Sequence, residues 1–174
     1  MLDLVRFLLD GLLLLWPFVI VDEWEHAMLV RRGIITRELG AGIHFRWPLL
    51  DRVETYPRVE QVEDLYVAVV ETSDNIPFAV SANIAFRMVS LPQNWRAVYD
   101  SDESLTRLAI GRIASTIAAR PMEALRRDRG VLERNLRSDL NAAVKDWGIK
   151  ITRVHITDCV RVRALRHYVD GVGG

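Results

Sequence analysis

The sequence has a single cysteine, Cys159, and only four histidines among 174 residues. One thiol cannot form an internal disulfide, and we expect it to be a small buried or half-buried residue rather than a nucleophile. The histidines, at His26, His44, His155 and His167, are scattered and no cysteine pair accompanies them. The sequence therefore predicts neither a disulfide framework nor a zinc site.

Net charge is also lacking, because 23 basic side chains balance 23 acidic ones. A neutral chain is not expected to bind nucleic acid. No nucleophile elbow, P-loop or dinucleotide-binding glycine pattern occurs, so we predict no enzyme, no metal and no cofactor. A small-ligand or enzymatic domain stays open as an alternative that a pocket with convergent polar groups would support.

The N-terminal residues 1–21 form a hydrophobic segment that we expect to associate with a membrane. Residues 11–21 are uncharged and apolar, whereas Asp3, Arg6 and Asp10 interrupt the part before them. An uninterrupted run of this length is short for a span and fits an interfacial or partly inserted segment. A buried element of a soluble core is the alternative, and no basic region or small-residue cleavage site indicates a signal peptide. The anchor residues we predict are Leu12, Leu13, Leu14, Leu15, Trp16 and Phe18.

The stretch LGAGIHFRWPLL, residues 39–50, predicts a tight turn followed by a strand. Two glycines two residues apart indicate a backbone reversal, and we expect positive φ at Gly42. Ile43, Phe45 and Trp47 then alternate with polar residues, which is the period of a half-buried strand, until Pro48 ends it. The predicted turn motif comprises Gly40, Gly42, His44, Phe45 and Pro48.

The remaining patterns predict an α+β fold with a β-rich part at 22–90, an α/β part at 91–158 and a short tail at 159–174. We expect a hairpin turn at 31–33 and an alternating strand at 77–90. A continuous apolar run at 65–70 predicts a strand buried on both faces. Helices are expected at 2–16, at 92–99, from Ser101 onward and, as one long helix, from Pro121 to Trp147, with Gly148 as its C-terminal stop.

The order of these motifs resembles the SPFH (band-7) family, which includes stomatin, prohibitin, flotillin and the bacterial HflK and HflC proteins. The family's glycine-rich turn and the strand after it, its Thr-x-Asp turn and its Trp-Gly-Ile exit all occur, although Ala41 stands where a proline is usual. After Cys159 the sequence lacks the long coiled-coil helix of larger members, so we expect a short member. The matching residues are Gly40, Gly42, His44, Phe45, Pro48, Asp51, Arg52, Val53, Thr72, Asp74, Asn75, Trp147, Gly148 and Ile149.

This resemblance implies a membrane-associated scaffold that forms a homo-oligomeric ring or cage and organises membrane lipids or a partner such as a membrane protease. The side of the membrane is left open, because Arg6 precedes the hydrophobic segment and Arg31 and Arg32 follow it. The alternative is a soluble structural or shell protein whose N-terminus packs against a neighbouring subunit.

Charge is unevenly distributed, since the charged residues within 54–74 are all acidic except Arg58 and the helix expected after Pro121 is rich in arginine. Either these are solvated faces of a neutral domain, or they are complementary surfaces that dock head to tail between copies. The second interpretation predicts an oligomer interface containing Glu60, Glu63, Asp64, Arg126, Arg127 and Arg134.

Overall fold

The structure, a computed structural model, describes residues 16–66 and 69–161. The chain divides into two compact units, each assembled from separate stretches of sequence. Unit 1 comprises Met1–Gln61, Phe86–Ser101 and Ala143–Lys150, and unit 2 comprises Val62–Ala85, Asp102–Ala142 and Ile151–Gly174. The parts expected from the sequence, 22–90 and 91–158, are consecutive instead. The helix expected at 2–16 lies outside the described residues apart from Trp16.

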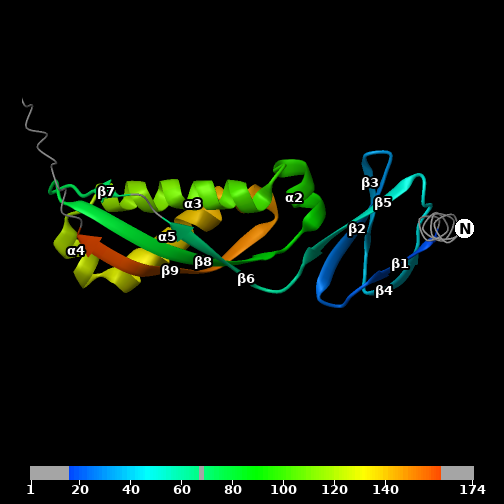
Figure 1. Cartoon of the computed structure of the whole chain (residues 1–174), viewed down its shortest axis with the longest axis horizontal. Helices are drawn as coiled ribbons and strands as arrows, with labels where there is room; N and C mark the ends of the chain where they lie inside the picture. The colour runs from blue at the N-terminus through cyan, green and yellow to red at the C-terminus, as the bar shows by residue number, and fades with distance from the viewer. Residues whose placement is uncertain (1–15, 67–68, 162–174) are drawn as a thin grey trace, which may run out of the picture. The chain divides into compact units, whose positions relative to one another are not determined.

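Unit 1 contains two small antiparallel sheets (Figure 1). The hairpin predicted at 31–33 is confirmed, and Arg32 and Gly33 both have positive φ, of 52° and 83°. Such a turn matches the twist of the strands it joins. A hydrophobic core between the strands of unit 1 is formed by Val21, Ala27, Leu29 and Leu39. One sheet pairs β1 (Phe18–Val21) with β4 (Gly42–Phe45), and the other has β2 (Glu25–Arg31) between β3 (Ile34–Leu39) and β5 (Asp51–Pro57).

Unit 1 also holds a short helix, α2 (Leu91–Ala97), and a 3-10 turn, η1 (Lys145–Trp147). The Ser90 hydroxyl accepts from Gln93 N–H at the start of α2, and Asn94 Nδ2 donates to Trp147 O at 3.0 Å. Gly148 ends η1 with φ of 67°, as predicted. Its carbonyl accepts from the N–H groups of Val89 and Ser90 at 2.8 and 3.1 Å, which closes the turn against α2.

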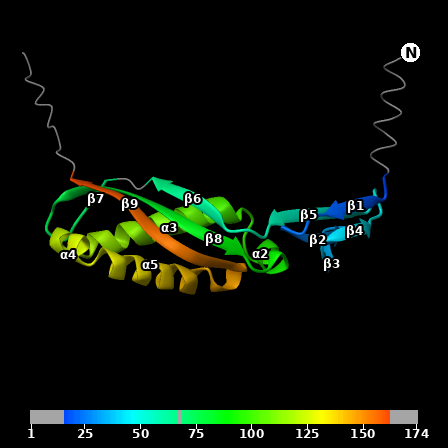
Figure 2. The same ribbon diagram turned by 90° about the horizontal axis from the view of Figure 1, so that it is seen from below.

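Unit 2 is a sheet with helices on one of its sides (Figures 1 and 2). The alternation predicted for residues 77–90 is confirmed, because its apolar members, Phe78 through Met88, are all buried. Apolar side chains of the helices are buried too, namely Leu105, Ala109 and Ile113 of α3 and Leu132 and Leu136 of α5. The strands are β6 (Gln61–Tyr66), β7 (Val70–Glu71), β8 (Pro77–Met88) and β9 (Ile149–Arg161), and the helices are α3 (Ser101–Ala118), α4 (Met122–Arg127) and α5 (Arg129–Ala143).

Two of the predicted elements are wrong, a helix in its length and a strand in its burial. The single helix from Pro121 to Trp147 is divided into α4, α5 and η1, because Asp128 leaves helical geometry at φ −116° and ψ 34°. The Asp128 carbonyl then accepts from Val131 and Leu132 N–H and begins α5, a position that aspartate favours. The strand at 65–70 is not buried on both faces, because β6 ends at Tyr66 and Val69 is exposed.

Helix α5 covers the backbone edge of β9 with a row of polar side chains spaced four residues apart. Asn141 bonds both polar backbone atoms of Ile151, donating from Nδ2 to the carbonyl and accepting at Oδ1 from the N–H, each at 2.9 Å. Glu133 Oε1 accepts from Ile156 N–H at 3.0 Å. Residues four apart share a helix face, so these groups serve β9 as a neighbouring strand would. The row is completed by Arg129, which bonds Thr157 O, and Arg137, which bonds Thr152 O.

Candidate functional site: an exposed aromatic surface

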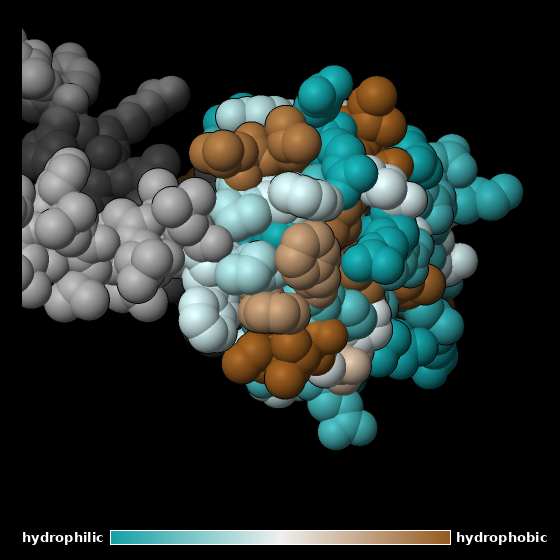
Figure 3. All heavy atoms as spheres, turned by 90° about the vertical axis from the view of Figure 1, so that its right-hand side faces the viewer, coloured by the Kyte–Doolittle hydropathy of each residue, from teal (hydrophilic) through white to brown (hydrophobic). Residues whose placement is uncertain are grey.

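The two-stranded sheet of unit 1 exposes its apolar side chains. Strands β1 and β4 pair antiparallel with Phe18 opposite Phe45 and Ile20 opposite Ile43. Both isoleucines are at least 70% exposed. In Figure 3, hydrophobic side chains lie at the surface among hydrophilic ones. We call Trp16, Phe18, Ile20, Ile43, Phe45 and Trp47, which are all exposed, the aromatic surface.

The rings of this surface contact one another in a continuous series. Trp16 meets Phe18, Phe18 meets Phe45, and Phe45 meets Trp47, with ring centroids 6.0, 6.0 and 5.6 Å apart and edge-to-face geometry. Aromatic pairs of this kind add stability beyond their buried area. The contacts therefore hold the rings together although the rings are exposed to solvent.

The half-buried strand expected at 43–47 is corrected in one respect. The alternation is present, but Ile43, Phe45 and Trp47 are exposed whereas His44 and Arg46 are partly buried. The polar side chains and the neighbouring backbone make local bonds, for example His44 Nε2 with Gly40 O at 2.6 Å and Arg46 N–H with Pro17 O at 2.7 Å. The apolar face consequently has no core to pack against.

The glycine turn before β4 has the backbone conformation that its sequence predicts. Gly42 has φ of +125°, a value that residues other than glycine rarely adopt, so the expectation of positive φ is confirmed. The bond between His44 and Gly40 spans the same turn. Pro48, the last residue of the predicted motif, is partly buried in the next turn. These residues shape the backbone that carries Phe45 and Trp47.

A buried carboxylate fixes the turn after Trp47. Asp51 accepts two bonds from Arg31, from Nε at 2.7 Å and from Nη2 at 3.0 Å, and a third from Trp47 N–H at 2.9 Å. The hydrogen bonds from Arg31 lower the pKa of Asp51 from 3.8 to about 2, with a smaller contribution from Trp47, while burial opposes the shift. The carboxylate therefore stays ionised and holds the aromatic surface to the β2–β5 sheet.

Replacing Asp51 by asparagine is expected to lower the free energy of unfolding by about 1–3 kcal/mol near pH 7, since charged hydrogen bonds are lost in a buried place. A carboxylate whose folded pKa is lowered stabilises the fold above its unfolded pKa and loses that contribution as the pH falls from about 4 to about 2. Urea unfolding of both proteins between pH 2 and 7 measures the gap, which should shrink toward pH 2. The exposed Asp22 gives the control, Asp22→Asn, and a gap for Asp51→Asn that is constant with pH would contradict the assignment.

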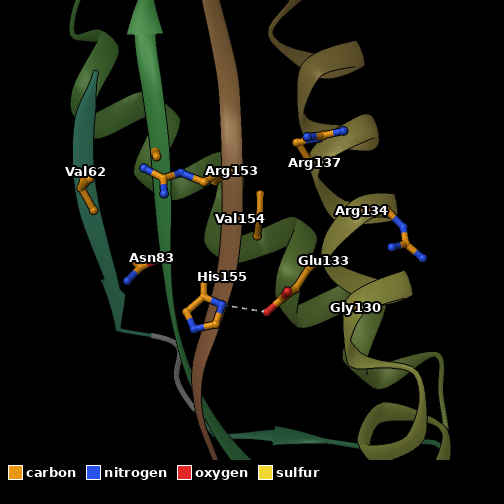
Figure 4. A pocket seen from close by; sticks show the side chains of 10 residues that line it. Val62, Asn83, Gly130, Glu133, Arg134, Arg137, Arg153, Val154 and His155 are labelled. Carbon is orange, nitrogen blue, oxygen red and sulfur yellow. Dashed lines mark ion pairs between the residues drawn. The ribbon is translucent and has the colours of Figure 1, made fainter. Parts of the chain in front are cut away.

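A second candidate, a pocket in unit 2, has a volume of about 670 Å³ and lies beside β9 (Figure 4). His155 Nδ1 pairs with Glu133 Oε1 at 3.1 Å, and Glu133 also meets Arg129 at 3.5 Å. Figure 4 shows the Arg134 side chain turned away from His155, on the far side of α5, and Arg137 is engaged with Thr152 O at 3.4 Å. The polar groups do not converge on one point, so this pocket is a weaker candidate than the aromatic surface. Its other lining residues are Val62, Asn83, Ala85, Gly130, Arg153 and Val154.

The charged residues predicted for an oligomer interface lie mainly in unit 2. Glu63 and Asp64 are exposed on β6, Arg127 is exposed on α4, and Arg134 is exposed on α5. Glu60 precedes β6 and already takes part in an interaction within the chain. The sixth residue, Arg126, belongs to α4. The structure thus leaves both charge signs accessible to a partner.

Among residues 16–66 and 69–161, no helix has the length and apolar character needed to cross a membrane. The predicted anchor residues Leu12 to Leu15 lie outside these ranges, whereas Trp16 and Phe18 belong to the aromatic surface. The same ranges contain no cluster of three acidic, histidine or cysteine side chains arranged to hold a metal ion. Leu49 and Leu50, exposed in the turn after Trp47, were not expected as site residues.

The fold and its motifs define a class, and a family comparison agrees with it. The sequence model of the family described as SPFH domain / Band 7 family matches residues 19–166, so the chain belongs to this family. It is 29% identical to a stomatin homolog of Pyrococcus horikoshii over 139 residues, which cover 80% of this chain and 52% of the relative. It is 25% identical to stomatin of Mus musculus over 141 residues, covering 80% of this chain and 50% of that protein.

The chain is also 27% identical to Mechanosensory protein 2 of Caenorhabditis elegans over 144 residues, which cover 80% of this chain and 29% of that protein. The chain spans about half the length of the stomatin relatives that it matches. The matched region covers β1 to β9 and thus includes most of the aromatic surface, beginning just after Phe18.

Proposed function

We propose that the chain is a membrane-associated SPFH scaffold that rests on the bilayer interface through its aromatic surface. The observation that carries this proposal is the series of edge-to-face rings from Trp16 to Trp47, exposed on a sheet whose first strand, β1, is the end of the hydrophobic N-terminal segment. Tryptophan and other aromatic side chains favour the boundary between headgroups and acyl chains. Membrane attachment is also what the resemblance to SPFH proteins implies.

Two features of the surface support membrane contact over simple exposure. Isolated apolar residues at a surface are ordinary, but six that adjoin on one sheet face form a patch that commonly marks an interaction site. The bonds of Asp51 to Arg31 and to Trp47 N–H keep the patch in place, so it is presented without prior rearrangement. The N-terminal segment would add its own apolar area to the same attachment.

Replacing Phe18 and Phe45 together by serine is expected to weaken binding of the full chain to phosphatidylcholine vesicles about tenfold. Each ring is 46% exposed, and burying the exposed part of two rings is worth on the order of 1–2 kcal/mol. Vesicle co-sedimentation measures the binding, and residues 1–17 are the same in both proteins. The matched control is Val89→Ser with Tyr99→Ser, which removes two exposed apolar side chains elsewhere in unit 1.

Equal binding of the serine variant and the parent would show that the aromatic surface does not meet the bilayer. If, in contrast, the parent does not bind vesicles and the serine variant forms a smaller oligomer than the parent, the aromatic surface is covered by a neighbouring copy. That result would favour the soluble structural or shell protein considered from the sequence. Quenching of Trp47 by brominated lipid, taken as the difference between the parent and Trp47→Phe, gives a second measure of membrane contact.

For assembly, we propose a heterologous contact between the acidic β6 strand of one copy and the arginine-bearing helices α4 and α5 of the next. Exposed Glu63 and Asp64 are available on the one side and exposed Arg127 and Arg134 on the other. Single exposed pairs contribute about 0.2–1 kcal/mol and are screened by salt. A closed ring repeats each contact, so modest pairs can set its register. Organisation of lipids or of a membrane partner such as a protease would follow from such a ring.

The double substitution Arg127→Glu with Arg134→Glu is expected to lower the oligomer mass while the melting temperature stays close to that of the parent. Adding Glu63→Arg and Asp64→Arg should restore part of the mass, because opposite charges would face each other again. Mass photometry of the three proteins at low and high salt decides this. An unchanged mass in the first variant would rule out charge-directed docking through these helices.

A further inference from the structure

The turn beside the aromatic surface forms one wall of a second pocket in unit 1, of about 360 Å³. The β2–β3 turn supplies another wall, and the two are joined by a bond from Arg32 N–H to Leu50 O at 3.4 Å. Helix α2 contributes the indole of Trp95. Three separate segments thus converge here, with Leu49, Leu50, Arg32, Arg52 and Trp95 among the lining residues.

The charge in this pocket is positive. Its only carboxylate, Asp51, is engaged by Arg31 and Trp47 N–H and remains ionised in that arrangement. Arg52 forms an ion pair with Glu54, and its side chain is 75% exposed. Within the described part of the chain, the guanidinium of Arg32 has no hydrogen bond or ion pair. A guanidinium without a partner at a pocket rim is suited to bidentate binding of a phosphate oxygen pair.

Exposed apolar side chains line the same pocket beside the arginines. Leu49 is 86% exposed, and Leu50 and Trp95 are 42% and 43% exposed. A free anion gains nothing from exposed leucines, whereas a phospholipid at an interface offers a phosphate beside hydrocarbon. Leu49 and Leu50 follow Trp47 in one short turn, with Leu50 N–H bonded to Trp47 O at 3.1 Å, so the pocket continues the aromatic surface.

We propose that this pocket binds the headgroup phosphate of an anionic phospholipid, with Arg32 as the phosphate ligand, Arg52 adding positive charge beside it through the part of its guanidinium that Glu54 leaves open, and Leu49 and Trp95 against the acyl boundary. This inference rests on the proposed membrane attachment and adds a lipid preference to it. Basic residues near an anionic membrane surface each add a contribution that falls off with salt. The aromatic surface would provide binding to any fluid bilayer, and the pocket would provide selection for negative headgroups.

The test compares full-length proteins on two kinds of vesicle, phosphatidylcholine alone and phosphatidylcholine mixed with phosphatidylglycerol. The parent is expected to bind the mixed vesicles roughly tenfold more tightly, in keeping with two basic residues at the surface. Arg32→Gln with Arg52→Gln should lose most of this preference and keep its binding to phosphatidylcholine. Arg32→Lys should retain most of the preference, and Arg87→Gln, which removes one exposed arginine at the end of β8, should retain all of it.

Each other outcome overturns the inference in a recognisable way. A parent that binds both vesicles equally would remove the lipid preference and leave the proposed attachment intact, whereas a parent that binds neither would remove both. A preference that survives the double glutamine variant, or that Arg87→Gln loses equally, would show general attraction rather than a site. A parent that shows no preference for mixed vesicles, but whose melting temperature rises more in inorganic phosphate than in sodium chloride of equal ionic strength, would assign the pocket to free phosphate.

Discussion

Replacing Gly148 by alanine is expected to lower the free energy of unfolding by about 3–5 kcal/mol. Gly148 has φ of +67°, which costs other residues on the order of 1–3 kcal/mol. A Cβ added there would also meet backbone, the carbonyl oxygen of Ser90 closer than atoms tolerate and the N–H nitrogen of Asn94 at 3.2 Å. Both contacts belong to the start of α2, so the strain falls on backbone that is already bonded and cannot move aside.

Two other glycines separate the conformational term from the steric one. Gly33 has φ of +83° but open space around it, so Gly33→Ala should cost only about 1 kcal/mol. Gly130 lies in α5 with open space, and Gly130→Ala should stabilise the protein by about 0.5–1 kcal/mol because alanine is the better helix former. Chemical unfolding of the three variants measures the series. Equal losses for Gly148→Ala and Gly33→Ala would show that α2 yields to the added carbon.

Features that depend on neighbouring residues alone could be predicted from the sequence. The alternation in β8 identifies its buried face, because the residues on that face from Phe78 to Met88 differ in polarity from those between them. Gly33 and Gly148 are recognisable as turn residues because few other residues accept positive φ. The family resemblance rests on such positions, which explains why short motifs were sufficient for it.

Features that depend on distant segments could not be predicted in the same way. Alternation at residues 43–47 defines two faces of a strand but does not say which face meets a core, and here the apolar face is exposed. The hydrophobic period of the helix predicted from Pro121 continues through Asp128, so only local capping chemistry reveals the break. Periodicity is therefore a better guide to element type than to burial or length.

The candidate site was anticipated only in part. Trp16 and Phe18 were expected to lie at a membrane, and the predicted turn motif is next to them, but Leu49, Arg32 and Trp95 were not expected together. These three come from different stretches of sequence and meet only because the β2–β3 turn, the turn after Trp47 and α2 adjoin. One signal was available in the sequence. The turn at residues 48–50 reads Pro-Leu-Leu, and it lacks the polar residues that turns usually contain.

Replacing Asn141 by alanine is the other substitution with a large expected effect, a loss of about 2–4 kcal/mol in the free energy of unfolding. The amide bonds both the N–H and the carbonyl of Ile151, a residue that is 1% exposed, so its removal leaves two buried backbone groups without their partner. Each buried group left unsatisfied costs about 1–3 kcal/mol. Besides the lower free energy of unfolding, we expect the backbone around Ile151 to open more often, because its N–H and carbonyl lie on the edge of β9 that α5 covers.

Asn135→Ala is the matched control, since Asn135 lies on the same helix and is exposed. It should change stability by less than about 0.5 kcal/mol, as surface substitutions do. Asn141→Asp keeps an acceptor for Ile151 N–H and loses the donor to Ile151 O, so it should fall between the parent and Asn141→Ala. Hydrogen exchange at Ile151 N–H should accelerate strongly in Asn141→Ala and little in Asn141→Asp. Unchanged exchange in both variants would show that Asn141 does not hold the edge of β9, and that apolar packing fixes α5 against this strand.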